Sequence, residues 1–206
     1  WRAATGPLLA ALALWGAVAP AGAETQSFNS SASAAAAGWT GWKNTTGGNN
    51  FTWQSSNVAG GAPGEAGGTF KRVSSGNAGW YADVTLGGAL TLTNTISASG
   101  RLVMTNVVNA NQHWWLGHLG TSGFDGGGRN LVGFKFQESS AGEIRVETVV
   151  FLKNGTQRTS GTTVVGFTGG NIAFFNYAYD PNGNGGLGRL AARLRSTANA
   201  AQRNND

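Results

Sequence analysis

The chain has 206 residues, enough for one domain with its own hydrophobic core, and its 34 glycines show no three-residue period, which excludes a collagen-like chain. Charged residues make up 11% and aromatic residues 10% of the chain. Disordered chains are rich in charged residues and poor in aromatic ones, so most of this sequence is expected to fold. The sequence has no cysteine, which excludes a disulfide scaffold and thiolate metal sites.

The net charge of +5 comes mainly from the two ends of the chain. Residues 24–186 hold nine Lys and Arg against eight Asp and Glu, a net charge of +1. A phosphate-binding surface needs several cations on one face, so we do not expect nucleic-acid binding. The arginines outside this body are Arg2, Arg189, Arg193, Arg195 and Arg203. The last four belong either to a solvated strand or frayed end, or to a patch for a polyanion.

A hydrophobic run, LLAALALWGAV, covers residues 8–18. Arg2 precedes it and the small residues 20–23 follow it, which predicts a signal peptide over residues 1–23 and a mature chain starting at Glu24. Eleven apolar residues are too few to span a bilayer, which takes about 20, and a buried helix is the alternative. We therefore expect a secreted or cell-surface protein with no membrane span in this stretch of sequence. Because position 1 is Trp rather than Met, we also expect a fragment clipped at its front.

Residues 28–79, rich in Gly, Ser, Asn and Ala, predict long loops and short strands, with one turn of helix over 32–37. Apolar and polar residues then alternate in nine predicted strands, over 80–86, 89–95, 101–107, 112–119, 130–137, 143–153, 162–167, 172–180 and 188–195. Gly87-Gly88 and Asn154-Gly155 predict hairpin turns, and residues 190–202 have a helix as their alternative. Strands at this spacing, with no helices between them, predict an all-β antiparallel sandwich or barrel.

Several short glycine-rich motifs follow one another in a recognisable order. They are Phe28, residues 57–70 (NVAGGAPGEAGGTF), Arg72, residues 81–83, residues 86–88, residues 109–111 and residues 179–190 (YDPNGNGGLGRL). In this order they resemble secreted bacterial concanavalin A-like lectin/glucanase, or laminin-G-like, domains, which often belong to surface proteins. The resemblance extends over about residues 28–195 and implies an antiparallel β-sandwich of the jelly-roll type, so we expect the domain to cover residues 24–195. It also implies further strands beyond, so residues 196–206 are expected to be a frayed tail or a truncated strand region.

Two carboxylates, Glu143 and Glu147, lie four residues apart on one predicted strand and therefore on the same face. They resemble the Glu-x-Asp-x-Glu signature of family 16 glucanases, which implies a retaining mechanism with one nucleophile and one acid/base. Arg145 stands where that signature has its Asp, and a cation there favours the ionised form of both carboxylates. The residues themselves favour a solvent-facing Glu/Arg/Glu row.

The segment Asp180-Pro-Asn182-Gly-Asn184-Gly matches the first half of a calcium-binding EF-hand loop. The bidentate Glu that such a loop needs at position 12 is Ala191 here, so a hairpin turn is favoured over a shallow Ca²⁺ site. Asp125, in a glycine-rich loop, is a further candidate oxygen ligand.

Trp114 and Trp115 are adjacent on a predicted strand, so their side chains point to opposite faces. One is expected in the core, and the other is a candidate platform for stacking on a sugar ring, with Gln112, His113 and the Asp125 loop as polar neighbours. Packing of both rings inside the protein is the alternative. No partner spacing around His113 suggests zinc.

The sequence has no G-x-S-x-G motif and no phosphate-binding glycine loop before a helix. Two function classes remain. The first is a non-catalytic module that contacts a polysaccharide or glycan, or forms a structural or adhesive layer, with no cofactor apart from a possible Ca²⁺ ion. The alternative is a glucanase-like hydrolase that uses Glu143 and Glu147.

Overall fold

The computed structural model describes the chain from residue 28 onward, with gaps. The described residues are 28–43, 48–60, 63–69, 79–85, 92–104, 113–119, 131–138, 144–151, 157–160, 163–165, 172–196 and 203–205. They form antiparallel β-sheets and two short helices, which confirms a mostly β fold. The predicted signal peptide lies outside the described residues.

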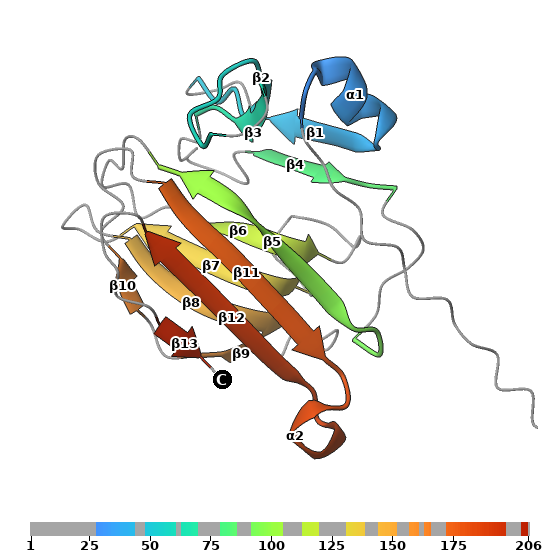
Figure 1. Cartoon of the computed structure of the whole chain (residues 1–206), viewed down its shortest axis with the longest axis vertical. Helices are drawn as coiled ribbons and strands as arrows, with labels where there is room; N and C mark the ends of the chain where they lie inside the picture. The colour runs from blue at the N-terminus through green and yellow to red at the C-terminus, as the bar shows by residue number, and fades with distance from the viewer. Residues whose placement is uncertain are drawn as a thin grey trace, which may run out of the picture.

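Two small two-stranded sheets and a short helix come first in the chain, at the top of Figure 1. Helix α1 (Ser31–Ala36) begins with a capping box, in which the side chains of Ser30 and Ser33 each accept a backbone N–H. Strand β1 (Trp39–Lys43) pairs with β4 (Gly79–Asp83), and β2 (Thr52–Gln54) pairs with β3 (Glu65–Gly67). The predicted turn of helix and the short strands are therefore confirmed.

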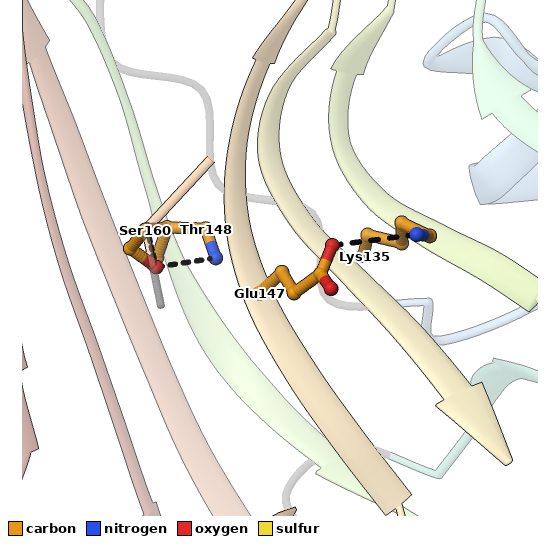
Figure 2. A network of polar contacts seen from close by, with 4 residues as sticks. All are labelled: Lys135, Glu147, Thr148 and Ser160. Atoms are coloured by element: carbon orange, nitrogen blue, oxygen red, sulfur yellow. Dashed lines mark hydrogen bonds and ion pairs between the residues drawn. The ribbon is translucent and has the colours of Figure 1, made fainter. Parts of the chain in front are cut away.

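The first larger sheet contains five consecutive strands. They are β6 (His113–Leu119), β7 (Leu131–Glu138), β8 (Ile144–Phe151), β9 (Gln157–Thr159) and β10 (Thr163–Val165). β6, β7 and β8 lie side by side, and β9 and β10 both pair with β8. Directly after β9, the Ser160 hydroxyl lies 2.6 Å from the Thr148 hydroxyl and accepts the Thr148 N–H (Figure 2). This contact keeps Ser160 attached to β8 beyond the end of β9.

The second larger sheet joins one early strand to the three last ones. Its members are β5 (Ile96–Val103), β11 (Ile172–Asp180), β12 (Arg189–Ser196) and β13 (Arg203–Asn205), in the order β13-β12-β11-β5. This sheet lies in front of β6, β7 and β8 in Figure 1. The strand prediction for residues 188–195 is confirmed against its helical alternative, and β13 shows a strand within residues 196–206.

Side chains from the two larger sheets meet in one hydrophobic core. Phe134 of β7 makes edge-on contacts with Phe175 and Tyr177 of β11, at centroid distances of 6.3 and 5.9 Å. The buried members of this core are Ile96, Val132, Phe134, Phe136, Ile144, Val146, Ala173, Tyr177, Tyr179 and Ala192. Strands β7, β8 and β11 contribute alternate residues to this core, and the intervening residues belong to the opposite face of each sheet.

The strand predicted over residues 89–95 is wrong for its described part, because residues 92–95 form a turn and β5 begins at Ile96. The Tyr179 hydroxyl donates a hydrogen bond of 3.1 Å to the Leu92 carbonyl, which ties this turn to β11. The hairpin predicted at Gly87-Gly88 falls outside the described residues, and β4 pairs with β1.

Candidate functional site

The pairing of β6 with β7 separates the two adjacent tryptophans. Trp114 lies opposite Phe136, and their rings stack in parallel with centroids 5.7 Å apart and an interplanar angle of 4°. It is half-buried and packs against the core. Trp115 lies opposite Lys135, so it belongs to the other, outward face of the sheet, where it is also half-buried.

Polar and charged residues surround Trp115 on this outward face. Lys135 donates a hydrogen bond from Nζ to Oε2 of Glu147 at 3.3 Å, and these side chains are 17% and 20% exposed (Figure 2). His113 is two residues from Trp115 and lies opposite Gln137, so both also belong to this face. We call Trp115 together with His113, Lys135, Gln137 and Glu147 the Trp115 face.

The electrostatics of the Trp115 face follow from its paired charges. Partial desolvation and the positive charge of Lys135 lower the pKa of His113, while the negative charge of Glu147 opposes that shift. The imidazole is therefore neutral over a wider pH range than in free solution and offers one donor and one acceptor nitrogen. Lys135 and Glu147 neutralise each other beside the indole, and the exposed Arg145, opposite Gln137, is a further charge at the edge of this face. The indole itself therefore suits an uncharged polar ligand better than an ion.

A flat indole beside an amide, an imidazole and an ion pair has the chemistry of a carbohydrate platform. The apolar face of a sugar ring stacks on an aromatic ring, and its hydroxyls form hydrogen bonds with the polar groups at the rim. Gln112 and Asp125, which the sequence suggested as part of this rim, lie outside the described residues. Lys135 and Gln137 were not among the predicted site residues, although both are polar residues, two positions apart, in a mostly apolar strand.

The carboxylates proposed for hydrolysis are only partly placed. Glu143 lies outside the described residues, and Glu147 engages Lys135 in the ion pair described above. Arg145 is exposed on the same face as Glu147. Retaining hydrolysis needs two carboxyl groups about 5–5.5 Å apart. Of the predicted solvent-facing row, Arg145 is exposed and Glu147 is 20% exposed and paired with Lys135, so that row stays a prediction.

The segment proposed as a Ca²⁺ site connects β11 to β12, which pair antiparallel, so the hairpin interpretation is confirmed. Oδ1 of Asp180 accepts the Asn182 backbone N–H at 2.9 Å, which forms a tight turn. Asn184 adopts a left-handed backbone with φ of 51°, and Asp180, Asn182 and Asn184 are all exposed. Among the residues that the structure describes, no three His, Asp or Glu side chains are grouped as metal ligands.

A histidine and a tyrosine form a polar contact inside the core. Nδ1 of His118 lies 2.6 Å from the Tyr177 hydroxyl, which joins β6 of one sheet to β11 of the other. Burial lowers the pKa of His118 and raises the pKa of Tyr177, so both are uncharged at neutral pH. The sequence places His118 on the same strand face as Trp114, but its partner lies 59 residues away and could not be identified from spacing.

The chain matches no protein-family model, no curated protein and no solved structure to a significant degree. In the described part of the chain, no helix is both long and apolar enough to cross a bilayer. What these residues establish is thus a mostly β, antiparallel protein with no identified family.

Proposed function

We propose that this chain is a non-catalytic β-sandwich module, secreted or displayed at a cell surface, that binds an uncharged polysaccharide through the Trp115 face. The observation that carries the proposal is the separation of the two indoles. Trp114 stacks on Phe136 against the core, while Trp115 lies on the outward face beside a mutually neutralised Lys135–Glu147 pair.

The fold in this proposal is a jelly roll of the concanavalin A-like type. Its support is the pair of antiparallel sheets that share one core, together with the motif order that resembles such domains. The module extends over residues 24–195, after a signal peptide over residues 1–23. Its role is to hold a polysaccharide or to contribute to an adhesive layer.

Binding at the Trp115 face is expected to be weak. A single half-buried indole on a sheet face buries little ligand surface and excludes little water. Sites of this kind give dissociation constants of about 10 µM to 1 mM, or roughly −4 to −7 kcal/mol. Affinity electrophoresis through gels that contain soluble β-glucan, xylan, mannan or glycol chitin detects binding in this range.

The test compares the two adjacent tryptophans. Trp115→Ala should abolish the retardation of the protein in the gel that retards the wild type, and should lower Tm only slightly. Trp114→Ala removes the same ring from the core side of the same strand, so it should cost more stability while the folded fraction is still retarded. Equal retardation of the Trp115→Ala variant and the wild type, or no retardation of the wild type in any gel, would contradict the proposal.

A further inference from the structure

The outward face of the second larger sheet gathers arginines from strands far apart in the sequence. Arg101 of β5 and the three arginines of β12, Arg189, Arg193 and Arg195, are all exposed at outward positions. Among the described residues of these strands, the acidic side chain on this face is Asp180, at the end of β11 and opposite Arg189. The far end of the face is therefore cationic.

An aromatic ring lies in the middle of this cationic end. Phe174 is 45% exposed and stands on β11 between Arg101 on one neighbouring strand and Arg195 on the other. The guanidinium carbon of Arg101 lies 5.6 Å from the centre of the Phe174 ring, which is cation–π geometry. We call Arg101, Phe174, Arg193 and Arg195 the arginine face.

The position of Arg101 is restricted by a neighbouring turn. A Cβ on Gly60 would lie 3.1 Å from Nη1 of Arg101, so the guanidinium rests beside this glycine. Glu65 fixes the turn by accepting the Ala59 N–H at 3.0 Å. The guanidinium and the ring are thus held together before any ligand arrives, which lowers the entropic cost of binding.

The spacing of the cations indicates the kind of anion. Arg101 and Arg195 are two strands apart, about 10 Å at the backbone, and Arg193 and Arg195 are about 7 Å apart. Duplex DNA carries a charge about every 1.7 Å along its axis, far denser than this array. A polymer with one carboxylate on each sugar matches the array better, and guanidinium groups bind planar carboxylates through two parallel hydrogen bonds.

We propose that the arginine face binds a polysaccharide of uronic acids. Along three consecutive sugars, the guanidinium groups of Arg101 and Arg195 pair with the carboxylates of the first and the third, and the exposed ring of Phe174 contacts the apolar face of the middle sugar. This site is on the opposite sheet from the Trp115 face and takes an anionic polymer rather than an uncharged one. It stands independently of the function proposed above.

The experiment uses polygalacturonate and its methyl ester, which share a backbone and differ in charge. Immobilised polygalacturonate should retain the wild-type chain in 50 mM NaCl and release it at higher salt, because exposed ion pairs are screened. The methyl ester should not retain it. The double variant Arg101→Gln/Arg195→Gln should bind polygalacturonate about tenfold more weakly. Phe174→Ser should weaken binding at unchanged net charge.

The matched control removes two positive charges from the other sheet. Arg145→Gln/Arg158→Gln lowers the net charge by the same amount, so it should bind polygalacturonate as the wild type does. Equal weakening by the two double variants would overturn the proposal, since it would show that binding depends on net charge alone. Tighter binding of dextran sulfate or of a 20-nucleotide RNA than of polygalacturonate would overturn the choice of a uronate polymer. Trp115→Ala should leave polygalacturonate binding unchanged, which separates this site from the Trp115 face.

Discussion

Replacing Tyr177 with Phe should destabilise the protein by removing the polar contact between its two larger sheets. The change deletes one oxygen and keeps the ring that packs on Phe134. It leaves Nδ1 of His118 without the hydroxyl that lies 2.6 Å away in a site where Tyr177 is 3% exposed. An unsatisfied buried polar group costs about 1–3 kcal/mol. A loss of about 2 kcal/mol corresponds to a Tm decrease of about 4–8 °C for a domain of this size.

The same contact makes stability depend on pH. Burial lowers the pKa of His118 in the folded protein, so the unfolded chain, with a pKa of about 6.5, binds the proton first as the pH falls. The contribution of His118 to the free energy of unfolding is therefore constant above about pH 6.5 and decreases below it. Between the two pKa values the slope is at most about 1.4 kcal/mol per pH unit.

Urea unfolding at pH 8, 7, 6 and 5 measures both effects. The chain has two histidines, so His113→Gln leaves His118 as the sole imidazole that titrates in this range. In this background we expect stability to fall between pH 6.5 and 5, and the additional change His118→Gln to flatten the profile. An unchanged free energy of unfolding for Tyr177→Phe, or a flat profile from pH 8 to 5 in the His113→Gln background, would refute the reasoning.

Three further variants test the packing of the two sheets. Gly100→Ala places a Cβ 2.8 Å from the Phe175 ring and should cost about 1–3 kcal/mol by urea unfolding; a neutral result would show that the ring moves freely. Phe134→Ala removes a side chain that is 1% exposed and should cost about 3–5 kcal/mol, and a loss below 1 kcal/mol would contradict its central place in the core. Lys135→Met removes the ion-pair partner of Glu147 and should cost about 1–3 kcal/mol in thermal melts, because both side chains are largely buried, at 17% and 20% exposed; an unchanged melting temperature would show that the pair does not contribute to stability.

The strands with strong alternation could be predicted from the sequence. Residues 172–180 alternate aromatic and small or polar side chains, and the predicted strand coincides with β11. β5 was misplaced because its first residues, Ile96 to Gly100, are mostly small, and such residues have weak strand propensity. They belong to a strand because Gly100 leaves room for the Phe175 ring on the neighbouring strand, which only tertiary packing determines.

The composition of the sites could be predicted only in part. Alternation alone predicts that Trp114 and Trp115 face opposite sides, but the pairing with β7 decides which of them meets the core. The contact between His118 and Tyr177 depends on how two sheets stack. The arginine face could not be predicted from the sequence, because Arg101 is far from Arg193 and Arg195 along the chain. The pairing of β11 with both β5 and β12 brings these arginines onto one surface.

The central claim, that an uncharged sugar stacks on Trp115, is tested most directly by the indole N–H signals in a ¹⁵N–¹H NMR spectrum. Single Trp→Phe variants at positions 114 and 115 assign the two signals. Titration with soluble oligosaccharides of the polysaccharide that retards the wild type should shift the Trp115 signal in a saturable way. The Trp114 signal, from the ring stacked on Phe136, should stay in place. A saturable shift of the Trp114 signal with none at Trp115, or no shift of either, would contradict the account.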